Sequence, residues 1–344
     1  MKLLKNVFFC LISILFINST AGNVTAKVIK LKFADMNPPG AANTIAADWW
    51  ASELAKRTQG RVQVERFWGA SLIGGYEQLH SVSKGIIDLT WYYSGYHPDI
   101  APLPLIGILP GMNVGPPKAS ISAVDEWCRT NPNIAKELKK NNVKYLFPYN
   151  VTNHYLWTKM PINNFDDLKG IRLRSFGPFM GLFKQLGCGL ITLPVPEVYD
   201  SLERGAVDGT TLYISNAVGL HLQEVVKYVN ISELGHNIGS PAVMNLKTWN
   251  KLPKDIQEII NKLNEEMVDK CSNIATDLHE KYMKLIQDAG LTITRFSPEE
   301  EKKLIEISRT QIWEPYAKKL DSKGIAGTET LQDYLRLLDK YSHQ

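Results

Sequence analysis

Residues 61–94, RVQVERFWGASLIGGYEQLHSVSKGIIDLTWYYS, decide the fold class of this chain. The segment 61–68 alternates between apolar and polar residues, which is typical of a β-strand, and GASLIGG has the composition of a turn. YEQLHSVSKG predicts a short helix, because Gly85 is the kind of residue that follows a helix end. IIDLTWYYS is rich in branched and aromatic residues and predicts a second strand.

The residues before this stretch extend the same series. VIKLKFADM, 28–36, predicts a strand, and NTIAADWWASELAKRT, 43–58, predicts a helix that begins at Asn43 and ends before Gly60. Strands that alternate with helices favour a largely parallel sheet with helices on its faces. The chain has 344 residues, which is enough for about two such units.

The first 26 residues have a different character. Lys2 and Lys5 precede a wholly apolar run, VFFCLISILFI, and a small, polar stretch ends at Ala26. This layout predicts a signal peptide, 1–26, cut after Ala26 or, as the alternative, after Ala21. The mature chain is therefore expected in the periplasm and not to span the membrane itself. Loss of the two lysines lowers the formal charge from +4 to +2, which gives no support to nucleic acid as a partner.

Three cysteines remain after the signal peptide: Cys128, Cys188 and Cys271. An odd number at wide spacing is not a disulfide framework. Cys188 has the surroundings of a small buried apolar residue. Whether Cys128 and Cys271 form a bridge stays open from the sequence.

The second half of the chain shows the same alternation of elements. Strands are expected at 143–149, 153–158 and 171–175, and helices at 178–186 and 196–205. From Lys254 to about Asp288 the helical pattern is unbroken, whereas globular helices typically run roughly 8–20 residues. A helix of that length can extend across two lobes.

The sequence therefore predicts two α/β lobes that are joined by more than one crossing strand and backed by a long helix spanning both. The expected first lobe comprises 27–151 plus 238–277, and the expected second lobe comprises 152–237 plus 278–344. In open α/β sheets, ligands bind beyond the carboxyl ends of the strands. We therefore expect a ligand site where the strand ends of the two lobes face each other.

Two arginines stand two positions apart in LKGIRLRSFGPFMGLFKQLG, residues 168–187. Arg172 and Arg174 should share one face of their strand, and burying an unpaired guanidinium is very costly. Arg174, at the carboxyl end of the strand, is expected to face the crevice, and Arg172 to meet solvent or a surface acid. The alternative for Arg174 is a structural salt bridge within its own lobe.

Several segments together resemble one known family. FDDLKGIRLRS, then LG at 186–187 and EVYDSLERGAVDG at 197–209, are similar to the substrate-binding subunits of tripartite ATP-independent periplasmic (TRAP) transporters. LKFAD, ELAKRTQGRVQVERFWGASLIGG and NLKTWNKLPKDIQEII extend the resemblance over most of the mature chain. The resemblance is to the dicarboxylate-receptor-like family. It implies a periplasmic-binding-protein-like fold with a ligand cleft between its lobes.

The resemblance implies that Arg174 pairs with the carboxylate of an organic acid, since a guanidinium fork matches a carboxylate bidentately. Twenty positions earlier, where the family often has a second Arg or a Gln, this chain has His154. His154 is expected either to donate a hydrogen bond to the ligand or to be a satisfied histidine near the surface. This departure casts doubt on any ligand that needs two arginines.

Family members carry polar residues facing the pocket after VDG, whereas this chain has Leu212 and Tyr213. TWYYSG places Trp91, Tyr92 and Tyr93 where some members carry a carboxylate. Trp91 and Tyr93 should share one face of their strand and Tyr92 should take the other. These aromatic residues either line the pocket or belong to the core.

The stretch ELGHN, 233–237, is expected to border the cleft, with Asn237 among the ligand-binding residues. Some family members hold a metal ion there beside a keto acid, and Glu233 and His236 are the candidate ligands. Two such residues are weak evidence for a metal site. Neither a metal nor a cofactor is therefore expected.

One anion clamp among apolar and aromatic walls favours a monocarboxylate with an apolar or aromatic body over a C4-dicarboxylate or a sialic acid. The expected protein is a periplasmic solute-binding receptor that closes on the acid. It would deliver the acid to the small and large TRAP membrane subunits for ion-gradient-driven uptake.

The main alternative is a two-lobe receptor for an ABC importer or a membrane sensor, and a periplasmic hydrolase is the remote one. The chain contains no G-x-S-x-G, H-E-x-x-H or C-x-x-C sequence and no nucleotide-binding motif. Enzyme activity is therefore not expected.

Overall fold

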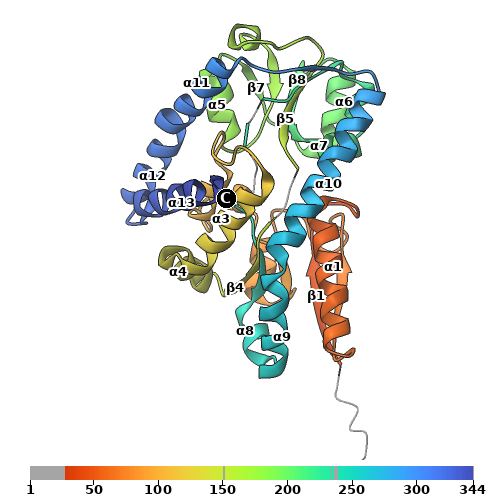
Figure 1. Ribbon diagram of the computed structural model, residues 1–344, viewed down its shortest axis with the longest axis vertical. Coiled ribbons are helices and arrows are strands. Elements are labelled where there is room, and N and C mark those ends of the chain that lie inside the picture. Colours follow the sequence, from red (N-terminus) through yellow and green to blue (C-terminus); the bar gives the residue numbers. More distant parts are fainter. Residues whose placement is uncertain (1–27, 150–151, 233, 236–238, 344) are drawn as a thin grey trace, which may run out of the picture.

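The computed structural model describes residues 28–149, 152–232, 234–235 and 239–343. Within them the chain forms two separate β-sheets, which follow one another along the long axis and are flanked by helices (Figure 1). The prediction of two α/β lobes is thereby confirmed. The predicted signal peptide, 1–26, lies outside the described residues.

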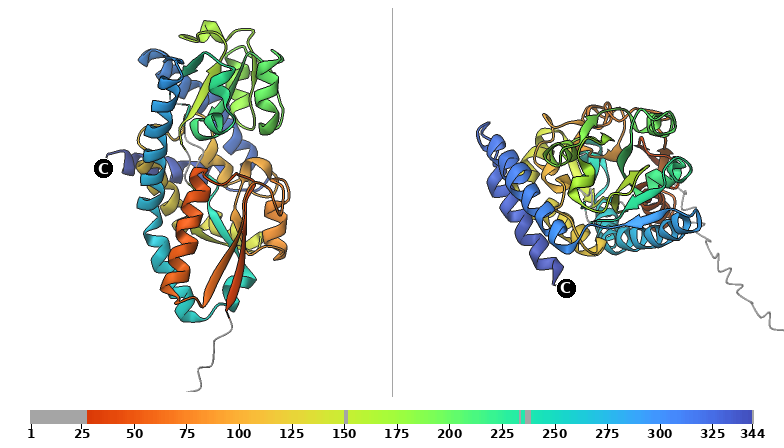
Figure 2. Two further views of the ribbon diagram at one scale, coloured as in Figure 1. Left: turned by 90° about the vertical axis from the view of Figure 1, so that its right-hand side faces the viewer. Right: turned by 90° about the horizontal axis from the view of Figure 1, so that it is seen from above.

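The first sheet has the strand order β2–β1–β3–β10–β4. Its strands are β1 (Ile29–Ala34), β2 (Val62–Phe67), β3 (Leu89–Trp91), β4 (Val143–Phe147) and β10 (Ala242–Asn245). β1 pairs in parallel with β2 and β3, whereas β10 runs antiparallel between β3 and β4. The carboxyl ends of β1, β3 and β4 therefore lie at one edge of the sheet, the edge toward the second lobe (Figure 2).

The alternation of side chains along β1 gives this strand one buried and one exposed face over most of its length. Leu31 and Phe33 are buried, while Lys30 and Lys32 are exposed. Helices then cover the sheet: α1 (Ala42–Arg57), α2 (Gln78–Lys84), α3 (Pro117–Thr130), α4 (Pro132–Lys140) and α8 (Leu246–Lys251). Aromatic rings fill the space between helices and sheet, with the ring centroids of Trp50 and Phe147 5.5 Å apart.

The second sheet has the order β11–β9–β5–β8–β6–β7. Its strands are β5 (His154–Thr158), β6 (Arg172–Arg174), β7 (Gly189–Ile191), β8 (Gly209–Tyr213), β9 (Tyr228–Asn230) and β11 (Thr292–Thr294). The helices of this lobe are α5 (Phe179–Gln185), α6 (Val198–Glu203) and α7 (Ile214–Gly219). β6 lies in the interior of the sheet, parallel to both β7 and β8.

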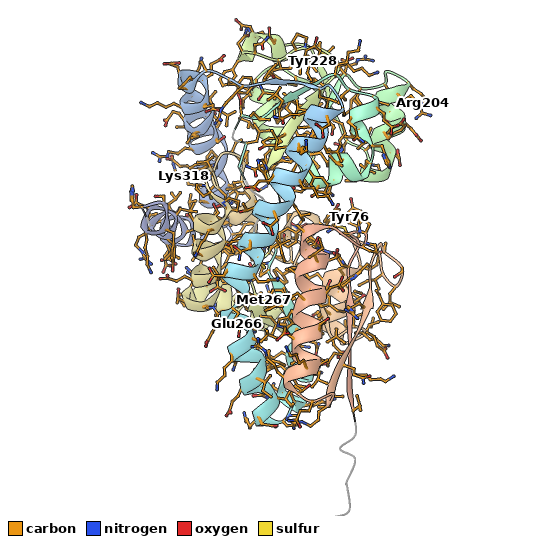
Figure 3. All side chains as sticks on the ribbon, turned by 45° about the vertical axis from the view of Figure 1, so that its right-hand side comes forward. Tyr76, Arg204, Tyr228, Glu266, Met267 and Lys318 are labelled. Atoms are coloured by element: carbon orange, nitrogen blue, oxygen red, sulfur yellow. The ribbon has the colours of Figure 1, made fainter. Side chains whose placement is uncertain are left out.

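The long helix is present, with one interruption. α9 (Lys254–Glu265) and α10 (Met267–Asp288) follow each other with a break at Glu266, at the junction labelled in Figure 3. The carboxylate of Glu266 accepts hydrogen bonds from Nη1 and Nη2 of Arg57 at 2.6 and 2.8 Å, which ties the junction to α1. α10 extends alongside both lobes (Figure 2), as the length of the pattern predicted.

The C-terminal helices cross back to the first lobe. They are α11 (Pro298–Ser308), a π-helical turn (Arg309–Trp313), α12 (Glu314–Asp321) and α13 (Gly327–Ser342). The indole of Trp313 donates to the Pro110 carbonyl at 2.8 Å, and Tyr334 stacks on Trp127 of α3 with centroids 4.5 Å apart. Leu304 of α11 belongs to the core of the second lobe, whereas the buried apolar residues of α12 and α13 join the core of the first lobe. The lobe boundaries remain a prediction.

The cysteines Cys128, Cys188 and Cys271 are free and buried, so no Cys128–Cys271 bridge is formed. Burial raises the pKa of all three thiols, which makes them poor nucleophiles. In the part of the chain that the structure describes, no helix has both the length and the apolar composition needed to cross a membrane.

Candidate functional site

Arg174 ends strand β6 and is almost completely buried, with 3% of its surface exposed. Its Nε and Nη2 donate to the backbone carbonyl of Leu193 at 3.2 and 3.1 Å. Nη1 is buried and has no hydrogen-bond partner among the described residues, which also offer this guanidinium no carboxylate. A buried cation without a counter-ion is costly, so the arrangement is suited to an anion from outside the chain.

Arg172, two residues earlier on the same strand, has a different environment. Its Nε and Nη2 donate to the Asp208 carboxylate at 2.9 and 2.5 Å, and the side chain is half exposed. The prediction that Arg172 meets a surface acid is therefore confirmed. The two arginines differ because the start of β6 opens to solvent, whereas its end is covered.

The first lobe approaches Arg174 through Tyr96, which lies in the 3₁₀ turn η1 (Ser94–Tyr96) just after β3. Burial raises the pKa of Tyr96, and the positive charge of Arg174 is the strongest effect that opposes this rise. Burial also lowers the pKa of Arg174, while the hydroxyls of Tyr96 and Tyr213 favour its charged form. Arg174 thus lies where the two lobes face each other.

His154 begins β5 and is buried, with 1% of its surface exposed. Its ring contacts Phe179 and Tyr213, with centroid distances of 4.3 and 4.8 Å. It also borders a small hollow shared with residues 113–115 of the first lobe and Leu234 of the second lobe's core, with a volume of about 10 Å³. That is about the space one water needs. The histidine is therefore not a surface residue.

Leu212 and Tyr213, adjacent on β8, point to different environments. Leu212 is buried in the core of the second lobe, so the expectation that it faces the ligand is contradicted. Tyr213 lies opposite His154 in the pairing of β8 with β5, and its side chain packs with the core of the first lobe. The strand alternation explains the difference, because adjacent side chains take opposite faces.

Trp91 and Tyr93 both pack against Tyr149, with centroid distances of 5.0 and 5.8 Å. Trp91 is fully buried and packs on Phe147 in the core. Tyr93, which follows the end of β3, donates its hydroxyl hydrogen to the Asp35 carboxylate at 2.9 Å. Of the two, only Tyr93 extends its polar group to the edge of the sheet that faces the second lobe.

Tyr92 points the other way, so the expectation that it lines the pocket is contradicted. It is fully buried, donates to Glu137 at 3.3 Å and accepts a hydrogen bond from Asn141 at 2.5 Å. Glu137 also accepts from the backbone N–H of Leu103 at 3.0 Å. This carboxylate–tyrosine–asparagine group is structural and joins α4 to the loop after β3.

Glu137 provides a pH-dependent test of this structural role. Burial raises its pKa from the ordinary 4.5 to about 7. Between about pH 4.5 and 7, the folded state therefore still holds a proton that the unfolded state has released. The free energy of unfolding consequently falls as the pH rises through this range. We expect Glu137→Gln to raise the free energy of unfolding by roughly 2 kcal/mol at pH 8 and to change it little at pH 4.5. Urea unfolding at both pH values measures this, and an equal change at both would contradict the assignment.

One buried acid at the site was not predicted. Asp35 follows β1, is fully buried, and accepts hydrogen bonds from Asn43, Gln78 and Tyr93 at 2.6, 3.2 and 2.9 Å. Burial is the main effect on its pKa, which is raised. The rule that ligands bind beyond the carboxyl ends of parallel strands, applied to LKFAD, could have identified it.

Asn237, Glu233 and His236 lie outside the described residues, so the ligand-binding role of Asn237 stays a prediction. Among the residues that the structure describes, no group of three or more His, Cys, Asp or Glu side chains is arranged to hold a metal ion.

Comparison with known proteins places the chain in context. The family model for bacterial extracellular solute-binding proteins of family 7, DctP, matches residues 33–319. A solute-binding protein of Albidiferax ferrireducens is 24% identical over 283 residues, which cover 78% of this chain and 80% of that protein. A TRAP periplasmic solute-binding protein of Desulfovibrio salexigens has a similar structure, with a TM-score of 0.80 at 25% identity over 91% of this chain and 96% of that one.

A TRAP solute-binding protein from a marine metagenome, described as specific for aromatic acid ligands, was solved with 3-hydroxybenzoate. It superposes with a TM-score of 0.80 at 22% identity, over 91% of this chain and 99% of that one. At this identity the similarity concerns the fold alone.

Proposed function

The chain belongs to family 7 of the bacterial extracellular solute-binding proteins, the DctP family, and from this we propose that it captures an organic acid between its two lobes. The acid is a monocarboxylate with an apolar or aromatic body. The protein is a receptor and not an enzyme, as are the members of its family. It delivers the acid to the small and large membrane subunits of a TRAP transporter after export through its signal peptide, residues 1–26.

The free nitrogen of Arg174 is the observation that carries this proposal. Two of its donors are used by the Leu193 carbonyl, which holds the guanidinium plane in place. Nη1, which no described residue engages, is then oriented before the ligand arrives. An oriented donor loses less entropy on binding, and a charge-assisted hydrogen bond to a carboxylate is roughly twice as strong as a neutral one.

The surroundings of Arg174 favour an apolar ligand body. The ring of Phe176 lies 5.4 Å from the guanidinium carbon, and Phe176 and Phe179 both face His154. Tyr213 packs against His154 with ring centroids 4.8 Å apart, and the hydroxyls of Tyr96 and Tyr213 both act on the charge of Arg174.

Closure of the lobes on the acid is the proposed mechanism. Arg174 keeps only 3% of its surface exposed, so the proposal requires the lobes to separate before an acid reaches its guanidinium. An acid held by Arg174 on one side and by Tyr96 and the residues that Tyr93 positions on the other stabilises the closed form, which shifts the population toward it. From the sequence, the lobes are 27–151 plus 238–277 and 152–237 plus 278–344. We propose one change to these bounds: the helices from Arg309 onward belong to the first lobe, because their apolar residues join its core.

Thermal unfolding of the purified mature protein with a panel of acids tests this function. A ligand at 100 times its dissociation constant should raise the free energy of unfolding by roughly 2.7 kcal/mol. We expect the shift with benzoate or a related monocarboxylate, and none with benzamide, which has the same shape and no charge. A shift with C4-dicarboxylates or sialic acid alone would contradict the proposed ligand class, and no shift with any acid would contradict the function.

A further inference from the structure

A polar cluster at the carboxyl end of β1 lies on the first-lobe side of the proposed site. It consists of the buried or half-buried side chains Asp35, Asn37, Asn43, Gln78, Tyr93 and Tyr149. Tyr96 connects it to the anion clamp, because the charges of both Arg174 and Asp35 act on the Tyr96 hydroxyl. The ring of Tyr96 also packs edge-to-face against Tyr76, which lies at the end of the first lobe nearest the second (Figure 3).

Asp35 sets the direction of every hydrogen bond in this polar cluster. Its carboxylate accepts from Asn43, Gln78, Tyr93 and the backbone N–H of Asn37, and no described cation pairs with it. The Tyr93 hydroxyl donates its single hydrogen to Asp35, at 2.9 Å.

The hydroxyl oxygen of Tyr93 must consequently act as an acceptor, and it accepts from Nδ2 of Asn37 at 2.7 Å. Nδ2 of Asn43 donates to the same oxygen at 3.3 Å. The reversed amide is excluded, since its carbonyl would face an oxygen that has no hydrogen to give.

This leaves the side-chain carbonyl of Asn37 as a fixed acceptor. No described residue donates to it, and Asn37 keeps part of its surface exposed beside the edge that faces the second lobe. A carbonyl oxygen can only accept, so it attracts a donor and repels the oxygens of a second carboxylate.

We infer that the Asn37 carbonyl binds a hydrogen-bond donor, such as a hydroxyl or N–H group, at the end of the acid remote from its carboxylate. This inference rests on the proposed function and names the ligand more closely. The receptor selects monocarboxylates that carry a distal donor, and it excludes acids that carry a second carboxylate there. Asn37 touches the ligand, while Tyr93 and Asp35 are positioning residues that act through it.

Matched pairs of acids test the inference by calorimetric titration of the full mature chain. The pairs are benzoate with 3- and 4-hydroxybenzoate, and phenylacetate with 3- and 4-hydroxyphenylacetate; terephthalate and isophthalate supply the second carboxylate. We expect the best hydroxy acid to bind roughly fivefold to tenfold tighter than its parent acid. The dicarboxylates should bind more weakly than the parent.

The chain contains a matched control for the variants. Glu137, Tyr92 and Asn141 repeat the carboxylate–tyrosine–asparagine arrangement beside α4, which carries Glu137 and ends at Asn141. In Asn37→Ala and in Tyr93→Phe, the parent acid should still bind, and the dissociation constants of the parent acid and the hydroxy acid should differ by less than twofold. Asn141→Ala and Tyr92→Phe should leave the preference unchanged.

Binding of the parent acid also reports that each variant is folded. If the parent acid binds the unmodified protein without any preference for hydroxylated acids, the inference is overturned and the proposed function stands. A preference that survives both Asn37→Ala and Tyr93→Phe, or tight binding of terephthalate or isophthalate, overturns it as well. Absence of binding by every acid overturns the inference together with the proposed function.

Discussion

Replacement of Arg174 by methionine should weaken binding of the preferred acid by at least about 100-fold. Removing one partner of a buried, hydrogen-bonded charge pair typically costs about 2–5 kcal/mol in binding, and 100-fold corresponds to about 2.7 kcal/mol. Methionine fills a similar volume and cannot donate. Arg174→Lys should keep the charge but lose the fork that the Leu193 carbonyl orients, and we expect it to retain only part of the affinity.

The same substitution should not destabilise the empty receptor. The guanidinium is buried, burial lowers its pKa, and one of its nitrogens lacks a partner among the described residues. Replacing such a cation by an apolar side chain is often neutral or stabilising. Arg174→Met should therefore leave the free energy of unfolding without ligand within about 1 kcal/mol or raise it, while affinity is lost. A residue that serves only to hold the fold together would show the opposite behaviour.

Arg172→Met is the matched control, since Arg172 lies on the same strand, two positions before Arg174. Its partner Asp208 is at the surface, and the pair is half exposed on the arginine side. Exposed pairs contribute roughly 0–1 kcal/mol, so the affinity should change less than about threefold. Titration calorimetry gives affinities, and urea unfolding gives stabilities. Equal losses of affinity in both variants, or none in Arg174→Met, would contradict the assignment of the clamp.

The placement of Arg174 could be predicted from sequence because it rests on a local rule. Each of the two arginines on one face of this strand requires a partner or contact with water. Arg174 is at the carboxyl end of the strand, where ligands bind in open α/β sheets. The placement of Leu212 could not, because β8 is buried on both faces, and its sequence has no polar–apolar alternation that would mark one of them. For Tyr92 and Tyr93 the alternation was correct, but β3 ends at Trp91, earlier than expected.

The tertiary partners of these residues were beyond reach of the sequence. Glu137 and Asn141 hydrogen-bond to Tyr92 but are about 45 positions or more away from it in the sequence. No local sequence pattern predicts such contacts. The course of the final helices was missed for the same reason. Their amphipathic pattern predicts helices with a buried face, whereas the choice between two lobes depends on contacts such as Trp313 with Pro110 and Tyr334 with Asn113.

Replacement of Gly239 by alanine should lower the free energy of unfolding by about 3 kcal/mol or more, because a Cβ atom has no space there. It would lie 2.2 Å from the Pro104 carbonyl oxygen and 3.1 Å from the carbonyl carbon of Gly107. Both are backbone atoms of the buried turn η2 (Pro104–Ile108), so no side chain can rotate away. Overpacking typically costs about 1–3 kcal/mol and more where the backbone must shift.

Gly239 matters for function because the chain passes between the lobes at this point. Leu234 belongs to the core of the second lobe, and Ala242 begins a strand of the first sheet. A shift of the backbone here should change how the lobes meet, so Gly239→Ala should weaken ligand binding even under conditions in which the variant is folded. Gly219→Ala is the control, since nothing lies within 4 Å of its added Cβ; being at the end of α7, it should be neutral or stabilise by up to about 1 kcal/mol. Urea unfolding and titration of both variants decide the matter. A Gly239→Ala protein as stable as the control would contradict this prediction. It would mean that the turn η2 and the chain at Gly239 can move apart at little cost, and that their contact does not fix how the lobes are placed.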